Sequence, residues 1–269
     1  PAGPGPTSRR AAPTVRAARG YHTPSPSAKG RTQWGVAPVA PLDPTNLPGS
    51  RRAPTGLPTA IHAMPAARVT TFFSLGALIS AAAFTQIAKS DNYFPEWFIP
   101  GFGGVDTGHI ARDYDQDEWS HAFGFSRYEI PKPDEETECY KAYHELDPNN
   151  DPDSGMCTYL WDDMVQLFAA MQLAGPKLTV DTMKSAFINQ KKLPPNPPWH
   201  MAGGYDLNDH TFPDWASEIW WDRNAMGSDG QKGTYRWVRG AKRYTYDQWP
   251  TEDPDVFTDK PSSITLAPV

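Results

Sequence analysis

Apolar residues recur at helical spacing in the second half of the chain. Between Gly155 and Ala174 they fall three or four positions apart, and this stripe of an amphipathic helix consists of Met156, Leu160, Met164, Leu167, Phe168 and Met171. Gly175-Pro176 then ends the pattern in the order expected after a helix C-terminus. The stripe predicts a long helix with one buried face.

Four shorter helices are predicted by the same spacing or by capping residues. Thr179 can cap a helix that runs to about Gln190, with Val180, Met183 and Phe187 directed inward. Asp106 can cap a short helix that ends near residue 112. The remaining two span residues 78–89 and 135–146.

Extended segments rich in β-branched and aromatic residues alternate with these helices. They cover residues 69–73, 93–101, 122–125, 128–130, 201–205, 218–222 and 234–239, with a hairpin turn at 227–233. At least one of Trp220 and Trp221 should point inward, because successive side chains of a strand face opposite ways. The alternation predicts an α/β fold with a largely parallel sheet and flanking helices.

Residues 72–87 are the most apolar window and admit a second interpretation. Met64, Arg68 and Ala81-Ala82-Ala83 imitate the charged start and small-residue cleavage site of a secretion signal. The window is shorter than the roughly 20 residues that a membrane span needs. We favour a short strand followed by a buried helix, because folded sequence continues directly afterwards; a secretion signal would then lie upstream.

The first 68 residues differ in composition from the rest. They contain 13 of the 29 prolines, eight arginines, one lysine and one acidic residue, Asp43, although the whole chain has a net charge of −6. We expect residues 1–68 to be disordered and residues 69–269 to be folded, since the first segment cannot bury enough apolar surface to offset chain entropy. Out-of-frame translation and a Pro-rich linker both explain this composition. The arginine pairs at 9–10 and 51–52 are isolated, which disfavours a nucleic-acid partner.

Two cysteines, Cys139 and Cys157, allow one disulfide, which would indicate an oxidising compartment. Two buried free thiols are the alternative. A zinc site is disfavoured, because no third and fourth ligand stands at a suitable spacing.

Acidic residues raise the question of metal or acid–base chemistry. Residues 147–153 place oxygen side chains at alternate positions, but they lack the glycine and the final glutamate of a calcium loop. A second patch, Asp106, His109, Asp113, Asp115, Asp117, Glu118 and His121, is typical of a solvated acidic surface. No nucleophile elbow, metal-binding helix or phosphate-binding loop is present. We therefore predict no catalytic residues, no metal and no cofactor.

Several motifs, taken in order, resemble the branched-chain amino-acid type of ABC-transporter substrate-binding protein, which has the type I periplasmic-binding fold. The motifs are Tyr93-Phe-Pro-Glu-Trp97, the stretch from Asp106 to Arg112, Asp115-Gln-Asp-Glu-Trp119, His121-Ala-Phe-Gly124, Cys139-Tyr-Lys-Ala-Tyr143 with Cys157, Leu173-Ala-Gly-Pro176, Gly203-Gly-Tyr205 and Glu218-Ile-Trp220. They span about 200 residues. The resemblance concerns the C-terminal portion only, because residues 1–68 stand where such proteins have a Rossmann-like lobe.

The resemblance implies a ligand held in a cleft between two α/β lobes, which would be incomplete in the chain as given. On it we place the ligand-binding residues at Gly101, Phe102, Gly103, Asp106, Phe123 and Phe125. The implied partners are a small polar ligand, such as an amino acid or amide, and an ABC permease. The implied location is extracellular or at the cell surface, with a lipid anchor possible upstream.

The tryptophans suggest a different function. Six of the ten lie in the last third of the chain: Trp199, Trp215, Trp220, Trp221, Trp237 and Trp249. Aromatic rings at this density can stack on sugars. A secreted carbohydrate-binding module is therefore the alternative to solute binding.

Overall fold

A computed structural model describes residues 56–73, 78–152, 154–198, 200–245, 247–248, 251–252, 255–258 and 265. All of them belong to one compact unit, residues 37–269. Helix α1 (Gly56–Ala63) lies inside the segment that we predicted to be disordered, and its Ile61 is 1% exposed. Ordered structure thus begins before the boundary predicted at residue 69; residues 1–55 lie outside the described part.

The first half of the sheet is built from parallel strands joined by helices. Strands β1 (Thr71–Phe73), β2 (Glu96–Ile99) and β3 (Ala122–Ser126) lie side by side in chain order. Helix α2 (Leu78–Ser90) connects β1 to β2, whereas α3 (Gly108–Ala111) and α4 (Gln116–Trp119) connect β2 to β3. Such strand–helix–strand units require a crossover connection, which the apolar run at residues 78–89 provides.

The second half of the sheet is antiparallel. Strand β4 (Ala216–Met226) pairs with β3, with β5 (Lys232–Trp237) and with the short β6 (Arg243–Tyr244), which follows the 3-10 turn η3 (Val238–Ala241). The sheet is therefore mixed. The predicted α/β class with parallel strands and flanking helices is confirmed, and so is the hairpin between β4 and β5, but residues 128–130 and 201–205 form no strand.

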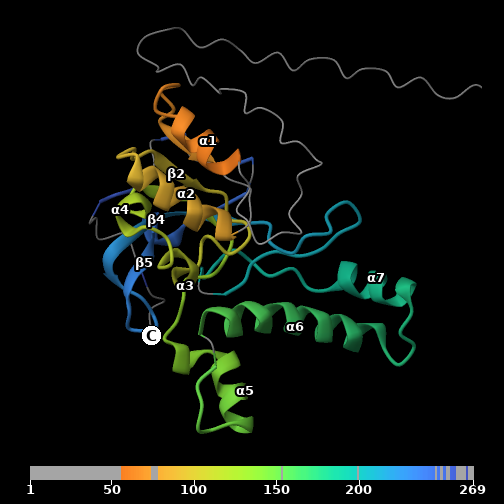
Figure 1. The fold of residues 1–269 in the computed structure, drawn as a ribbon. Coiled ribbons are helices and arrows are strands. Elements are labelled where there is room, and N and C mark those ends of the chain that lie inside the picture. The colour runs from red at the N-terminus through yellow and green to blue at the C-terminus, as the bar shows by residue number, and fades with distance from the viewer. Residues whose placement is uncertain are drawn as a thin grey trace, which may run out of the picture. The chain divides into compact units, whose positions relative to one another are not determined.

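Helices α5 (Glu138–Leu146), α6 (Ser154–Ala174) and α7 (Val180–Asn189) lie between β3 and β4 in the chain, after the short turn η2 (Asp134–Glu136). Helix α6 packs against both α5 and α7 (Figure 1). The predicted disulfide between Cys139 and Cys157 is present and joins α5 to α6. Thr179 caps α7, as predicted, in a reciprocal pair with Thr182.

The core lies on one face of the sheet, beneath α2 and α4. Its largest members are Trp97, Trp119, Trp221, Tyr235 and Trp237, all at most 3% exposed. Gly124 permits the close pairing of β2 and β3, since a Cβ there would lie 2.1 Å from the carbonyl oxygen of Ile99. Of the pair Trp220-Trp221, Trp221 belongs to this core, as predicted for at least one of the two.

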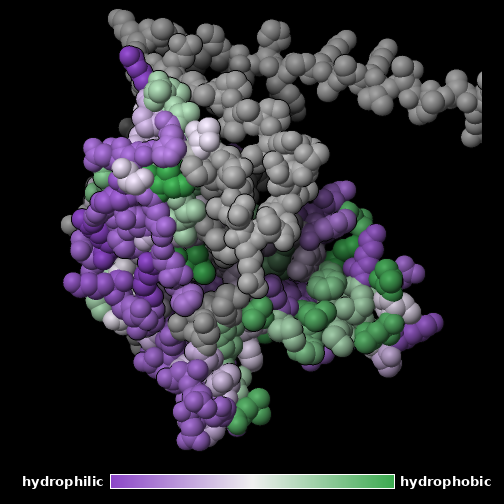
Figure 2. Space-filling view, in the orientation of Figure 1, coloured by the Kyte–Doolittle hydropathy of each residue, from purple (hydrophilic) through white to green (hydrophobic). Residues whose placement is uncertain are grey.

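The predicted apolar stripe of α6 is largely exposed, which contradicts the sequence expectation. Leu160, Met164, Leu167 and Phe168 are 39–53% exposed, and Val180 on α7, predicted to point inward, is 84% exposed. Figure 2 shows hydrophobic residues gathered over α6 and α7. The periodicity identified the helix correctly but could not show which face would meet other elements.

Candidate functional site

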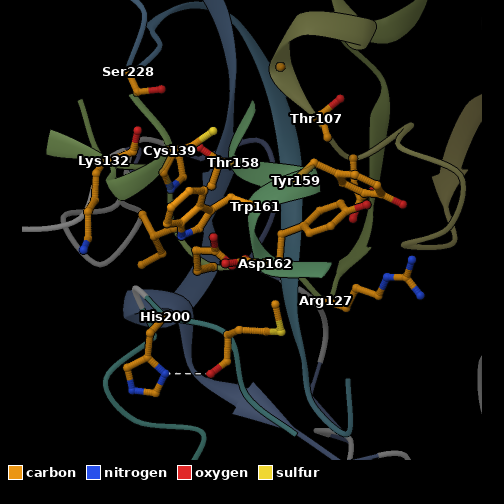
Figure 3. Close-up of a pocket in the computed structure, with 18 of the residues that line it drawn as sticks. Thr107, Arg127, Lys132, Cys139, Thr158, Tyr159, Trp161, Asp162, His200 and Ser228 are labelled. Atoms are coloured by element: carbon orange, nitrogen blue, oxygen red, sulfur yellow. Dashed lines mark hydrogen bonds between the residues drawn. The ribbon is translucent and has the colours of Figure 1, made fainter. Parts of the chain in front are cut away.

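A cavity of about 560 Å³ separates α6 from the segment that follows β3. Its wall is formed by the start of α3, residues 127–134, residues 158–166 of α6, the loop at 200–213 and the turn between β4 and β5. Trp161, Asp162 and Tyr159 lie at the centre of the view in Figure 3, between Lys132 on one side and Arg127 on the other. A cavity of this size suits a small molecule.

Asp106 is the most deeply buried acid of the cavity wall. It is 4% exposed, and neither carboxylate oxygen accepts a hydrogen bond from the described residues. Burial raises the pKa of Asp106 to about 6, although the nearby Ser126 side chain and the Arg127 guanidinium partly oppose the rise. Both carboxylate oxygens are shielded from solvent. Burial therefore disfavours the charged form of Asp106 more than these neighbours favour it.

The predicted capping role of Asp106 is wrong. Thr107 takes the N-cap position of α3, and its side chain makes no capping hydrogen bond. Asp106 instead contributes to the cavity wall, and its charge helps to raise the pKa values of Tyr114, Tyr128 and Tyr235. Loop position after β2, rather than capping chemistry, accounts for where this side chain lies.

Aromatic rings form another part of the wall. Tyr128 meets Tyr159 edge to face, with ring centroids 5.4 Å apart. Burial raises the pKa of Tyr128, and its hydroxyl makes no hydrogen bond of good geometry with a described residue. Tyr205 and Phe212 add a second aromatic pair at a centroid distance of 5.6 Å. These rings can contact apolar or cationic parts of a ligand.

A pair of carboxyl groups, Glu129 and Asp162, lies across the same cavity. Burial raises the pKa of Asp162, and the adjacent Glu129 charge raises it further because two carboxylates at close range repel. Asp163 contributes in the same direction. A hydrogen bond between the Glu129 and Asp162 side chains also raises the pKa of Asp162, so the Asp162 carboxyl group favours its neutral form.

Two arginines, the half-buried Arg112 and the buried Arg243, hold the wall in place. Arg112 on the α3 side forms two ion-pair contacts with Asp229 in the β4–β5 turn, and its Nε donates to the carbonyl of Gly233 at 2.9 Å. Arg243 on β6 donates to the carbonyls of Tyr128, Pro195 and Pro198 at 3.1–3.4 Å. Arg243 thereby ties the segment after β3 to the loop before residue 200.

Of the six residues predicted to bind ligand, Asp106 alone is among the described residues that line the cavity. Gly101 lies against β3, where an added Cβ would come within 3.0 Å of the Phe125 carbonyl oxygen, while Gly103 has open space around it. Phe102 is 55% exposed. Phe123 and Phe125 both contact Phe98 on the sheet face opposite the core. The structure therefore does not bring the six together, and their role in binding stays a prediction.

The sequence analysis missed the contribution of α6. Thr158, Asp162 and Gln166 all line the cavity and stand at intervals of four, so they form a polar stripe along one face of the helix. This spacing was readable in the sequence. Because the same helix also has an apolar stripe, the sequence analysis interpreted the helix only as a packing element.

The acidic patch is not simply a solvated surface. Asp106 and Glu118 are buried, Asp115 caps α4 by accepting from the backbone amides of residues 117 and 118, and Asp117 pairs with Lys89 and Arg223. Within the described parts of the chain, no group of three or more His, Cys, Asp or Glu side chains is placed to hold a metal ion. Asp153 of the calcium-loop pattern lies outside those parts.

Most of the described tryptophans pack in the interior. Trp97, Trp119, Trp220, Trp221 and Trp237 are each at most 7% exposed. Trp199 and Trp249 lie outside the described residues. The tryptophan density is thus largely explained by packing, which removes the main observation behind a carbohydrate-binding module.

No family model matches the chain, and no curated protein sequence matches it. Solved structures with similar folds include a leucine-, isoleucine-, valine-, threonine- and alanine-binding protein from Brucella ovis, with 13% identity and a TM-score of 0.47 over 74% of this chain and 49% of that one. A fatty acid ABC transporter substrate-binding protein from Thermomonospora curvata has 13% sequence identity and a TM-score of 0.44, and the match covers 68% of this chain and 46% of that one. A possible leucine/isoleucine/valine-binding protein from Rhodopirellula baltica SH 1 has 14% sequence identity and a TM-score of 0.43, and the match covers 62% of this chain and 42% of that one.

The likeness to each of these solved structures is partial. The chain spans about half the length of each. No described helix is both long and apolar enough to cross a bilayer.

Proposed function

We propose that this chain is the ligand-binding part of an extracytoplasmic solute-binding protein, which captures a small polar molecule and delivers it to an ABC permease without bond chemistry. The observation that supports this is the cavity of about 560 Å³, whose wall combines polar and charged side chains with aromatic rings. Binding pockets for small molecules have this size and this mixture of groups. The order of motifs in the sequence supports the same class.

The disulfide between Cys139 and Cys157 supports an oxidising, extracytoplasmic location, because such bonds are rare in the cytosol. Cys139 itself lines the cavity. The bond therefore fixes the start of α6 beside the site, which favours a preformed wall. The permease and a lipid anchor belong to the proposal on the strength of the motif resemblance.

The test is a thermal-shift screen of the full chain against amino acids, amides, amines and small organic acids. A ligand at about 100 times its dissociation constant should add about 2.7 kcal/mol to the free energy of unfolding. Calorimetry should then give one site per chain. If no compound in the four groups raises the melting temperature, the proposal fails.

A pair of variants tests whether binding occurs in this cavity. Thr158 lines it, whereas Leu160, two positions later on the same helix, is 53% exposed and does not. We expect Thr158→Trp to fill the cavity and abolish the melting-temperature shift, and Leu160→Trp to preserve it. Equal binding by both variants would place the ligand elsewhere.

A further inference from the structure

Helix α6 carries its polar and apolar residues on opposite sides, and the polar side faces inward. Thr158, Asp162 and Gln166 line the cavity. Leu160 is two positions from both Thr158 and Asp162, and Met164 is two positions from both Asp162 and Gln166. Because a helix makes one turn in about 3.6 residues, two positions correspond to about half a turn. The apolar stripe therefore lies on the side of α6 away from the cavity.

This outward stripe is an exposed apolar patch. Leu160, Met164, Leu167 and Phe168 are 39–53% exposed, and Figure 2 shows hydrophobic residues gathered over the same helix. Since a large side chain covers about 200 Å² in full, the four together leave on the order of 400 Å² exposed. Apolar patches of this size on a protein surface often mark an interaction site.

The composition of α6 also favours a protein partner over solvent. Only two of its 21 residues are charged, Asp162 and Asp163, and both line the cavity. The rest of the helix has no charged side chain, whereas the solvent-facing side of an amphipathic helix is normally charged or polar. Interface cores, by contrast, are poor in charged residues and rich in methionine and aromatic residues. The outward side of α6 has the composition of an interface core.

The spacing of the stripe fits a partner that is itself a helix. Leu160, Met164, Leu167 and Met171 stand four, three and four positions apart. This alternation is typical of a two-helix seam, in which each apolar side chain inserts between those of the facing helix. The series of intervals is the same in both directions. A second α6 that runs antiparallel therefore presents the same seam in reverse order, with Met164 opposite Leu167 and Leu160 opposite Met171.

We propose that two copies of this chain pair through the apolar stripe of α6, with the two helices antiparallel across a two-fold axis between Met164 and Leu167. Such a symmetric contact is closed, so association stops at two chains. Two stripes bury on the order of 800 Å² of apolar surface, and specific interfaces begin at roughly 1,000–1,200 Å² in total. The area therefore corresponds to a weak dimer, with a dissociation constant of about 1–100 µM. The contact lies away from the cavity, so it is independent of the proposed solute binding.

Sedimentation velocity of the full chain is the direct test. Between about 0.5 and about 200 µM, the average mass in solution should rise from that of one chain toward that of two, with a midpoint in the range given above. The mass of a single chain at every concentration would overturn the proposal, since the stripe would then need a different partner. Growth beyond two chains would also contradict it, because a closed two-fold contact leaves no stripe free.

Two methionines of similar exposure provide a matched pair of variants. Met164 in the stripe is 44% exposed, and Met226 at the end of β4 is 49% exposed. Met164→Glu places a charge without a partner in the contact, which should weaken dimerisation at least about tenfold. Met226→Glu should dimerise as the unmodified chain does. Equal dimerisation by the two variants would place the contact elsewhere.

A mixture of two variants tests the antiparallel arrangement. Leu167→Lys alone should weaken the dimer as Met164→Glu does. In an equal mixture of the two, the introduced charges have opposite signs and face each other across the axis, so dimer should form at concentrations where neither variant alone forms it. In a parallel pair the two positions would not face each other. A mixture that dimerises no better than its components would therefore overturn the antiparallel arrangement.

Folding of the variants is checked where the chain is monomeric. At about 0.5 µM, below the expected dissociation constant, the stripe is exposed in each single chain, so Met164→Glu and Leu167→Lys should give the circular dichroism of the unmodified chain. A variant that passes this control and still dimerises like the unmodified chain counts against the contact. If Met164→Glu fails the control, Leu167→Lys tests the same seam.

Discussion

Trp97 donates a hydrogen bond of 3.2 Å from its indole Nε1 to Oε2 of Glu118, in a part of the core where Glu118 is 0% exposed. The other carboxylate oxygen, Oε1, has no partner among the described residues. Burial raises the pKa of Glu118 to about 7, and the Trp97 bond offsets this only in part. The core therefore contains a carboxyl group that favours its neutral form.

Neutralising Glu118 should stabilise the protein in mild base. The folded-state pKa lies above the ordinary 4.5, so the stability associated with protonated Glu118 is complete below pH 4.5 and is lost as pH rises through about 7. We expect Glu118→Gln to raise the free energy of unfolding by about 1–3 kcal/mol at pH 8 and to change it little at pH 4.5. Urea denaturation at both pH values measures this.

The adjacent Asp117 is the control for this prediction. Hydrogen bonds from Lys89 and Arg223 lower its pKa, so its contribution to stability is lost as pH falls rather than as pH rises. Asp117→Asn should therefore not stabilise the protein at pH 8. If Glu118→Gln had a lower free energy of unfolding than the unmodified chain at every pH, the charged form of Glu118 would be the one favoured in the core.

Arg243 should be essential to the structure around the cavity. It is 7% exposed and donates to three backbone carbonyls, those of Tyr128, Pro195 and Pro198. Arg243→Met keeps much of the side-chain volume but leaves these acceptors without their donor, which we expect to cost about 2–4 kcal/mol. Arg243→Lys should recover part of the loss. If Arg243→Met unfolds at the same urea concentration as the unmodified chain, the carbonyls must find other donors.

The disulfide should contribute to stability through the chain segment that it closes. Cys139 and Cys157 are 18 positions apart, for which the chain-entropy model gives about 3 kcal/mol. We expect Cys139→Ala/Cys157→Ala to lose about that much and to respond no further to a reducing agent, while the unmodified chain loses stability when reduced. Denaturation curves with and without reductant test both points, and insensitivity of the unmodified chain to reduction would contradict them.

The sequence predicted local features better than long-range ones. The cap of α7 at Thr179, the end of α6 at Gly175-Pro176 and the β4–β5 hairpin depend on neighbouring residues, and all three are found. The pairing of β3 with β4 joins residues almost a hundred positions apart, so no local pattern could show that this half of the sheet is antiparallel.

The site was predictable only in part for the same reason. Asp106 follows a buried strand, which made it a candidate, but the other residues of the cavity wall come from distant elements and include Tyr235 on β5 and Gln166 on α6. The polar stripe of α6 was visible in the sequence. Its meaning depended on which face of the helix meets the segment after β3, and spacing alone cannot determine that.

The exposed apolar stripe of α6 should tolerate charged substitutions. Met164 and Phe168 are 44% and 51% exposed, whereas Ala170 on the same helix is 0% exposed. Because surface substitutions usually change stability by no more than about 0.5 kcal/mol, we expect Met164→Lys and Phe168→Lys to unfold at nearly the same urea concentration as the unmodified chain. Ala170→Lys introduces a charge and extra volume into a closed site and should cost about 3 kcal/mol or more. Circular dichroism at 222 nm follows all three, and a loss in Phe168→Lys comparable to that in Ala170→Lys would mean that the stripe is buried in the folded protein, as its periodicity predicts.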